Sequence, residues 1–201
     1  MNQKTLELLK KIQDSGIDIC LISKYWTDAQ LMNYYDLGFR KFGENRIKIL
    51  IEKTKKFPED IEWHFIGNIQ SKNLKKICEY SDVIQSFDRL DLLEKLTKLD
   101  DVEILLQINL TEGNDINGIK ISELEMAIGK INNLGINCNG FMFHPPIEIS
   151  DAEKIKIFKK MNKIFSKYPN YKTLSMGTSS DYKLANVCGA TLNRLGRVLK
   201  N

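Results

Sequence analysis

The sequence has few cysteines, and none is arranged for a shared bond or metal. The four residues Cys20, Cys78, Cys138 and Cys188 lie far apart and form no C-x-x-C pair. This pattern argues against a disulfide framework and against a zinc knuckle. We therefore expect four reduced thiols that are buried and serve as packing residues.

Long apolar runs are also missing. No stretch approaches the roughly 18 uninterrupted apolar residues that a membrane span requires. Residues 1–11 form an amphipathic segment with lysines, unlike the apolar centre of a signal peptide. These absences predict a cytoplasmic protein without a membrane partner. Hydrophobic residues nevertheless make up 42% of the 201 residues, so we expect one domain with a complete core over residues 1–201.

Arginine is scarce. Only five of the 30 basic residues are arginines, and the formal net charge is +4. Because nucleic-acid binders carry a strong basic patch or stripe, we expect no nucleic-acid partner. The lysines within 53–56 and 154–163 lie in helical stretches, which indicates solvated helix faces. So modest an excess of positive charge favours a small anion as ligand.

Several familiar catalytic motifs are absent. The chain has no G-x-G-x-x-G turn, no Walker loop and no G-x-S-x-G elbow. Its two histidines, His64 and His144, belong to neither an H-x-x-x-H nor an H-E-x-x-H pattern, so no metal site is expected. We expect His64 to make a hydrogen bond in or near the interior of the fold.

What the sequence does contain is a regular alternation of short β-like runs with longer helical stretches. A leading helix is expected over residues 3–13 and a second helix over 28–37. Eight strands are expected over 17–23, 39–42, 62–66, 83–86, 103–109, 139–143, 173–176 and 191–195. This order predicts an α/β fold, a single (β/α)8 TIM barrel. An open, doubly wound sheet is the alternative, but it would need a glycine-rich turn after the first strand.

Barrel enzymes and binding proteins place their functional groups after the strands, so the residues found there are candidates. Gly177 and Ser179 follow the seventh expected strand, and Gly196 and Arg197 follow the eighth. Backbone N–H groups in these turns could bind a phosphate, aided by a helix that begins near Asp181. The alternative is that both are ordinary turns between strand and helix.

Lys24 is the second candidate because it ends the apolar first strand. We expect its ammonium group to project into the mouth of the barrel, where partial removal from water would favour the neutral, nucleophilic amine. An amine placed there can form a Schiff base. The alternative is an ordinary solvent-facing lysine, because most lysines of this chain face solvent.

Six segments together resemble one known family. They are LISK (21–24), FGEN (42–45), EWHFIGNIQ (62–70), QINL (107–110), LSMGTSSD (174–181) and NRLG (193–196). In this order they are similar to the pyridoxal phosphate homeostasis proteins, which are barrels of the alanine racemase N-terminal type. The resemblance runs from about residue 17 to 197. It implies a barrel that holds pyridoxal 5′-phosphate (PLP) covalently and acts in intracellular vitamin B6 balance, without an established enzymatic turnover.

The resemblance also implies roles for individual residues. Lys24 matches the lysine that forms the Schiff base with PLP, and Asn45 matches an asparagine that lines the cofactor pocket. Arg194 matches the arginine that faces the pyridine nitrogen. The phosphate contacts implied are Ser179, Gly196 and the backbone amide of Arg197.

Some positions depart from the family pattern. Arg197 stands where relatives usually have a small hydroxyl residue, so a side-chain hydroxyl contact is lost there. Thr178 replaces a common methionine, and Lys72 and Asn73 differ from the frequent order of that segment. Ile116 stands where many relatives have a lysine. We therefore expect some contacts at the rim of the site to differ from those of relatives.

The function that we expect is a PLP carrier or buffer rather than an enzyme. The expected partners are PLP, other B6 vitamers and PLP-dependent apoenzymes, and the protein is expected to be a monomer. The alternative is a Schiff-base enzyme on the same barrel, either an aldolase or a PLP-dependent racemase. A racemase needs a second base opposite the lysine, and the spacing of His64 and Tyr25 places neither of them for it. Only five residues follow Gly196, so no further domain is expected to supply that base.

Overall fold

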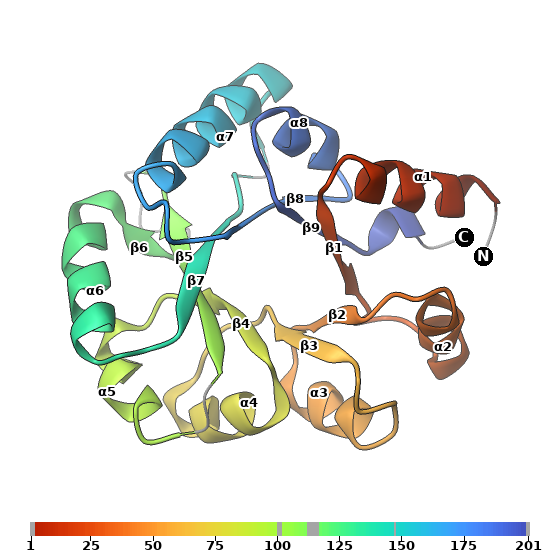
Figure 1. Ribbon diagram of the computed structural model, residues 1–201, viewed down its shortest axis with the longest axis horizontal. Coiled ribbons are helices and arrows are strands. Elements are labelled where there is room, and N and C mark those ends of the chain that lie inside the picture. Colours follow the sequence, from red (N-terminus) through yellow and green to blue (C-terminus); the bar gives the residue numbers. More distant parts are fainter. Residues whose placement is uncertain (1–2, 100–101, 112–116, 147, 200–201) are drawn as a thin grey trace.

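The computed structural model describes residues 3–99, 102–111, 117–146 and 148–199. Within these ranges all strands belong to one parallel sheet, and helices surround it (Figure 1). None of the helices described is long and apolar enough to cross a membrane.

Eight strands close into a ring. Each strand pairs in parallel with its neighbours, and the β9–β1 and β4–β5 pairings complete the circle. The strands of the ring are β1 (Asp18–Ile22), β2 (Lys41–Glu44), β3 (Glu62–Phe65), β4 (Val83–Phe87), β5 (Glu103–Asn109), β7 (Cys138–Phe143), β8 (Thr173–Thr178) and β9 (Leu192–Leu195). A two-residue strand, β6 (Ile119–Lys120), pairs only with the end of β5. The expected (β/α)8 barrel is therefore confirmed.

The helices form the outer layer (Figure 1). They are α1 (Gln3–Asp14), α2 (Asp28–Asp36), α3 (Ile47–Thr54), α4 (Leu74–Tyr80), α5 (Leu93–Leu96), α6 (Ile121–Asn133), α7 (Asp151–Phe165) and α8 (Tyr182–Val187). Three short 3-10 turns, η1 (Ser71–Asn73), η2 (Leu90–Leu92) and η3 (Arg197–Leu199), complete the layer. The expected leading helix is present as α1. The N-termini of α2 and α7 are fixed by capping boxes, in which Thr27 pairs with Gln30 and Ser150 with Glu153.

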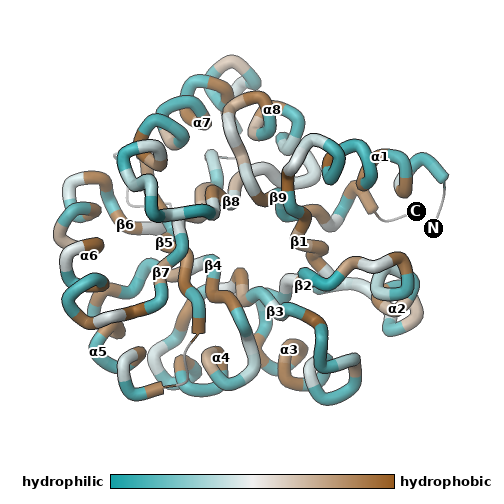
Figure 2. The backbone as a smooth tube through the Cα atoms, viewed as in Figure 1, coloured by the Kyte–Doolittle hydropathy of each residue, from teal (hydrophilic) through white to brown (hydrophobic). Residues whose placement is uncertain are grey.

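The main core lies between the strands and the helices. It is one large cluster that includes fully buried phenylalanines such as Phe42, Phe141 and Phe158. Each helix carries hydrophobic and hydrophilic residues along its length, as expected for elements with one buried face (Figure 2). Because successive side chains of a strand point to opposite faces, the remaining strand residues fill the inside of the ring.

The second expected strand was placed two residues too early. It was expected at residues 39–42, but β2 runs from Lys41 to Glu44. Gly43 lies inside this strand. The neighbouring strand β1 packs closely on this position, since a Cβ atom there would come 2.6 Å from Ile22 Cδ1. Glu44 is consequently a strand residue and not part of the following loop. In the sequence, Gly43 followed by Glu44 is typical of a turn. The close packing of β1 against Gly43 explains why a glycine occurs inside this strand.

The cysteines largely match the expectation. All four are free, and Cys20, Cys78 and Cys188 are buried, whereas Cys138 is only partly buried. Burial raises the pKa of the Cys20 thiol far above its ordinary value. These thiols are therefore packing residues, with Cys138 nearer the surface than expected.

Candidate functional site

A cleft of about 1120 Å³ opens at the end of the barrel where the strands terminate. Polar and charged residues that follow different strands converge on it, which is the usual arrangement at the C-terminal end of such barrels. Its lining includes Ile22, Lys24, Tyr25, Asn68, Gln107, Met142, His144, Glu148, Thr178, Ser179, Arg194, Gly196 and Arg197.

Lys24 lies in the turn immediately after β1 and lines this cleft. Four of the five residues of β1 are buried, so the strand fixes the position from which the lysine projects. The ammonium lies over the ring of Tyr25, with Nζ 5.1 Å from the ring centroid. Lys24 is exposed, however, so the expectation that its amine is partly removed from water is wrong. The turn beyond the strand carries the side chain out to the rim of the barrel.

A buried ion pair supports the segment that carries Lys24. Lys53 Nζ on α3 lies 2.5 Å from Glu44 Oε1 on β2, and both side chains are at most 10% exposed. The same ammonium donates to the carbonyl oxygen of Ser23 at 2.8 Å, and the Ser23 hydroxyl donates to Glu44 at 2.7 Å. The ion pair therefore holds the peptide that precedes Lys24.

Sequence reasoning missed this ion pair, because residues 53–56 were interpreted as a solvated helix face. Lys53 is in fact buried with its charge satisfied. A signal was present, since Glu44 adjoins an apolar strand and a buried carboxylate requires a partner.

Arg194 on β9 is held rigidly beside the cleft. Its Nη1 donates to the carbonyl and the hydroxyl of Ser175 at 2.8 and 2.7 Å, and its Nη2 donates to the carbonyl of Phe143 at 3.0 Å. Burial lowers the pKa of Arg194 to about 10. Since this value is still well above neutral pH, the side chain remains a cation there.

Ser179 joins the turns that follow β8 and β9. Its Oγ accepts hydrogen bonds from the backbone N–H groups of Gly196 and Val198, each at 3.1 Å. The amide of Gly196 therefore faces Ser179 and not the open cleft. A hydroxyl that accepts two hydrogen bonds still has its own proton to donate, so Ser179 can donate to an anion.

Gly196 and Arg197 lie next to this hydroxyl. A Cβ atom at Gly196 would come 3.1 Å from both Cβ and O of Ile22, so close packing on β1 explains the glycine. Arg197 is exposed and lines the cleft. The helix expected near Asp181 is α8, whose first residue is Tyr182. The Asp181 carboxylate accepts from the amide of Thr178 at 2.6 Å.

The structure places other expected residues elsewhere. Asn45 does not line the cleft: it is exposed between β2 and α3, and its carbonyl oxygen would lie 2.2 Å from a Cβ at Gly67. Lys72 and Asn73 are in the 3-10 turn η1, outside the lining. Ile116 lies outside the described residues.

The two histidines occupy opposite ends of the barrel. His144 follows β7 and lines the cleft, where its Nδ1 lies 2.7 Å from the carbonyl oxygen of Pro145. A carbonyl only accepts, so Nδ1 carries the proton and Nε2 is the acceptor. Desolvation, followed by the positive charge of Arg194, lowers the pKa of His144. His144 is thus a site residue that sequence reasoning did not assign, although its place after a strand was a signal.

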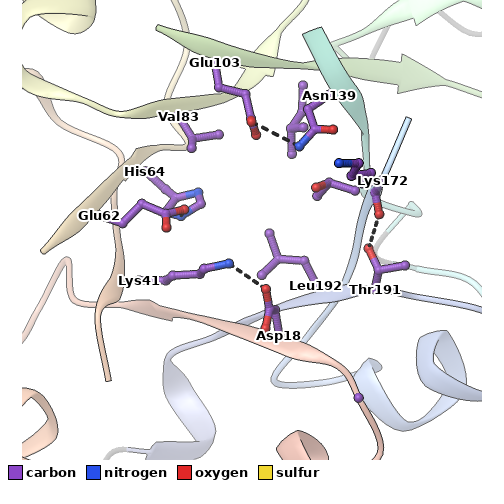
Figure 3. Close-up of a pocket in the computed structure, with 13 residues that line it drawn as sticks. Asp18, Lys41, Glu62, His64, Val83, Glu103, Asn139, Lys172, Thr191 and Leu192 are labelled. Atoms are coloured by element: carbon purple, nitrogen blue, oxygen red, sulfur yellow. Dashed lines mark hydrogen bonds and ion pairs between the residues drawn. The ribbon is translucent and has the colours of Figure 1, made fainter. Parts of the chain in front are cut away.

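His64 lies inside the barrel, 2% exposed, and lines a separate pocket of about 450 Å³ at the N-terminal end. Its hydrogen bond with Gln85, with 2.8 Å between Nδ1 and Nε2, confirms the expected interior contact. In this pocket Lys41 pairs with Asp18 at 2.5 Å, and Asn139 donates to Glu103 at 3.1 Å (Figure 3). Burial raises the pKa of Glu103.

The charges of the cleft favour an anionic ligand. Three basic side chains, Lys24, Arg194 and Arg197, line it with one acidic side chain, Glu148. Among the described residues, no group of three or more histidine, cysteine or carboxylate side chains could hold a metal ion. The arrangement can hold an anion at Ser179 and a hydrogen-bond acceptor at Arg194, with a primary amine in the same cleft.

Comparison with known proteins gives one consistent result. Residues 24–199 match the family described as the alanine racemase N-terminal domain. The chain is similar to the pyridoxal phosphate homeostasis protein of Haemophilus influenzae, with 30% identity over 98% of this chain and 85% of that protein. It is 29% identical to the protein of the same name from Escherichia coli K12, over 91% of this chain and 84% of the relative.

Among solved structures, the chain resembles PipY of Synechococcus elongatus with PLP bound. The TM-score is 0.89 and the identity 28%, and the likeness covers 98% of this chain and 99% of PipY.

Proposed function

Because this chain belongs to the alanine racemase N-terminal domain family and, within it, to the pyridoxal phosphate homeostasis proteins, we propose that it binds PLP in the cleft at the C-terminal end of the barrel and acts in PLP homeostasis. The observation that carries the proposal is the convergence of Lys24, Arg194 and Ser179 on one cleft with an excess of positive charge.

Each of these groups suits one part of the cofactor. The Ser179 hydroxyl and the backbone amide of Arg197 would hold the phosphate because both offer hydrogen-bond donors, and the Arg197 side chain adds a positive charge to the cleft. The Arg194 guanidinium only donates hydrogen bonds, so it suits a pyridine nitrogen that keeps its lone pair. Lys24 supplies the amine for the aldehyde.

Bound PLP would supply an aldehyde, and the Lys24 amine is the group that would hold it reversibly as a Schiff base, with water formed on attachment and used up on release. The exposed position of Lys24 keeps this bond accessible to water and to competing amines. Reversible attachment is what a carrier or buffer needs. We propose that PLP-dependent apoenzymes are the recipients, and that other B6 vitamers with an aldehyde but no phosphate bind more weakly, since they lose the Ser179 contact.

We further propose that the protein does not catalyse efficient racemisation or transamination. Arg194 remains a cation at neutral pH, and a cation opposite the pyridine nitrogen disfavours protonation of that nitrogen. An unprotonated ring withdraws electrons from a substrate less strongly. His64 is removed from consideration as a second base because it lines the opposite pocket, and His144 is the histidine that lines the cleft.

A deuterium wash-in assay tests this part of the proposal. The PLP-loaded protein is incubated in deuterated water with L-alanine and other amino acids, and exchange at Cα is followed. We expect turnover far below that of ordinary enzymes. Exchange at roughly 1 per second or faster would show that the protein is an enzyme. The His144→Gln variant would then identify the base.

The binding proposal is tested by the absorbance of the protein mixed with PLP, before and after borohydride reduction, followed by peptide mapping. We expect a visible band and a reduced adduct on Lys24. An adduct on another lysine would refute the assignment. An adduct that forms only with a sugar phosphate, without a visible band, would indicate the aldolase alternative. Light scattering would check the proposal that residues 1–201 act as a single-domain monomer.

A further inference from the structure

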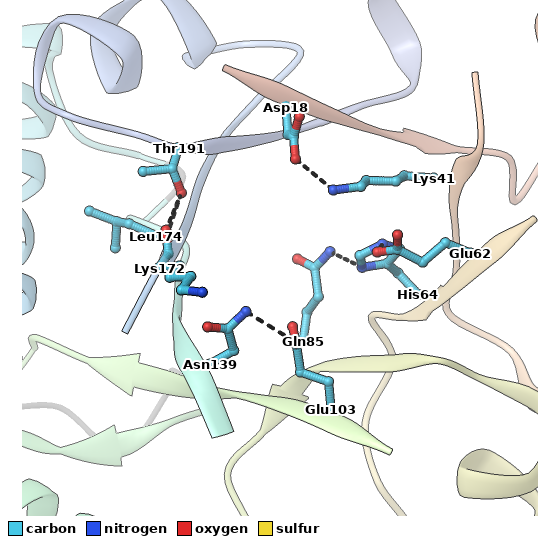
Figure 4. Close-up of polar contacts among 10 residues, drawn as sticks. All are labelled: Asp18, Lys41, Glu62, His64, Gln85, Glu103, Asn139, Lys172, Leu174 and Thr191. Atoms are coloured by element: carbon cyan, nitrogen blue, oxygen red, sulfur yellow. Dashed lines mark hydrogen bonds and ion pairs between the residues drawn. The ribbon is translucent and has the colours of Figure 1, made fainter. Parts of the chain in front are cut away.

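A series of polar side chains, all buried except Glu62, crosses the inside of the barrel. Arg194 Nη1 lies 2.7 Å from Ser175 Oγ, which lies 2.6 Å from Gln85 Oε1. Gln85 Nε2 lies 2.8 Å from His64 Nδ1, and His64 Nε2 lies 2.9 Å from Glu62 Oε1 (Figure 4). We call these five residues the Arg194–Glu62 network. It connects the cleft at one end of the barrel to the pocket at the other.

Most of this network is deeply buried, so its hydrogen bonds matter for stability, and only His64 Nε2 among its buried atoms has no hydrogen-bond partner in the described structure. Ser175 and Gln85 are completely buried, and His64 is 2% exposed. Small apolar clusters also occupy the interior, one of Cys20, Ile22 and Leu192 and one of Val83, Leu105 and Met142. A buried polar group without a partner destabilises a protein, whereas a satisfied network fixes a single arrangement.

The chemistry of the groups fixes the direction of every hydrogen bond. A guanidinium only donates, so Ser175 Oγ accepts from Arg194 and its single proton points to Gln85 Oε1. The amide of Gln85 then presents its N–H groups to His64, whose Nδ1 must accept. The proton of the neutral imidazole is therefore on Nε2, next to the Glu62 carboxylate. From Arg194 to His64 the donors therefore all point the same way, and the Glu62 carboxylate lies 2.9 Å from His64 Nε2 without forming a hydrogen bond of good geometry with it.

From this geometry we propose that Ser175, Gln85 and His64 are positioning residues that orient the Arg194 guanidinium toward the pyridine nitrogen of PLP, and that the negative charge of Glu62 beside the ring favours the His64 tautomer with its proton on Nε2. The inference rests on the proposed function. Three of the five N–H groups of Arg194 are used by Ser175 and Phe143, and the others remain for the cleft. Without Gln85 the Ser175 hydroxyl loses the acceptor of its proton, which loosens one of the three contacts that orient the guanidinium.

The first test needs no PLP. The ¹⁵N chemical shifts of the two histidine rings are recorded at about pH 8.5, where an ordinary histidine is neutral. We expect opposite tautomers: His64 protonated on Nε2 and His144 protonated on Nδ1. The variant His144→Gln assigns the signals. Protonation of His64 on Nδ1, or averaged shifts for its two nitrogens, would overturn the network.

Gln85→Glu sharpens this test. A carboxylate accepts from Ser175 and also accepts from His64, so His64 Nδ1 should gain a proton. A His64 ring that still has no proton on Nδ1 in this variant would show that Gln85 does not set the tautomer.

The second test uses bound PLP. In Gln85→Met the side chain keeps its length but loses its hydrogen bonds, and we expect PLP affinity to fall about tenfold, equal to about 1.4 kcal/mol. We also expect a shift in the pH midpoint of the visible band. Leu105→Met, a volume-conserving change in the same interior, should alter neither quantity. Ser175→Ala provides a second variant should Gln85→Met not fold, and the same changes are expected of it.

The outcomes are distinct. A normal visible band with wild-type affinity and midpoint in both Gln85→Met and Ser175→Ala refutes the positioning role alone. A wild-type protein without a visible band and without a borohydride adduct refutes the proposed function and with it the role of the network toward PLP. In that event the histidine tautomers still decide whether the network exists.

Discussion

The two ends of the barrel carry similar numbers of ionisable side chains but use them differently. At the N-terminal end, the pocket of about 450 Å³ is lined by charges that contact one another, such as Asp18 with Lys41. At the C-terminal end, the cleft of about 1120 Å³ presents Lys24 and Arg197, and no ion pair involves either of them in the described part of the chain. Charges that satisfy one another serve stability, and charges left without a counter-ion leave room for a ligand.

The largest expected effect separates the two ends directly. Lys24→Ala should abolish the visible band and the borohydride-stable adduct with PLP, because no other amine is placed beside Arg194 and Ser179 among the residues lining the cleft. The matched control is Lys172→Ala at the N-terminal pocket, which should keep both signals. Absorbance and peptide mapping check the result. Loss of the adduct in Lys172→Ala, or its retention in Lys24→Ala, would contradict the comparison.

A large effect on stability is expected at the ion pair that supports Lys24. Lys53→Met leaves the Glu44 carboxylate buried and unpaired, which should lower the free energy of unfolding by about 3–5 kcal/mol. Adding Glu44→Leu should recover much of this loss. Lys41→Met breaks the more exposed pair with Asp18 and should cost only about 0–1 kcal/mol. Urea denaturation measures all three, and equal losses for Lys53→Met and Lys41→Met would refute the contrast.

A moderate effect on affinity is expected at the phosphate end of the cleft. Ser179→Ala removes the hydroxyl donor, and it also removes the oxygen that holds the backbone amides of Gly196 and Val198 in place. PLP should therefore bind about tenfold more weakly, equal to about 1.4 kcal/mol. Gly196→Leu should weaken binding further, since its side chain would displace Ile22. Gly129→Leu on α6 is the matched control, because a Cβ atom at Gly129 would meet no heavy atom of another part of the protein within 4 Å. If both site variants bind PLP with the wild-type affinity, the phosphate is not bound at Ser179 and Gly196.

The smallest effect concerns pH and the N-terminal end. The contact with His64 is the main cause that lowers the pKa of Glu62. A carboxyl group with a lowered folded-state pKa stabilises the fold above its unfolded pKa of about 4.3 and loses that contribution as pH falls through the folded value. The Glu62 side chain is 38% exposed, so the contribution should stay below about 1 kcal/mol. Unfolding of Glu62→Gln measured between about pH 7 and pH 3 should approach the wild-type value at low pH, whereas a constant difference would contradict this.

Much of the fold could be predicted from the sequence because local patterns carry it. The run at β1 is apolar enough to indicate a buried strand, and β5 was placed at its observed bounds, Glu103–Asn109. The glycine at position 43 is compatible with both a turn and a strand, and the bounds of β2 were therefore predicted two residues too early. The position of Lys24 just beyond a strand also follows from the local pattern.

Contacts across the barrel were decided only by the tertiary structure. Ser175 and Gln85 are hydrogen-bonded although 90 positions separate them, and Lys53 meets Glu44 because α3 folds back onto β2. The alternation of side chains along a strand tells which residues share a face, but closure of the ring and the register between strands decide which of them meet. Because of the same closure, His64 and His144 lie at opposite ends of the barrel, and Asn45 lies outside the lining of the cleft. The sequence by itself determined the barrel and the lysine after its first strand, and the packing of distant strands determined which side chains surround that lysine.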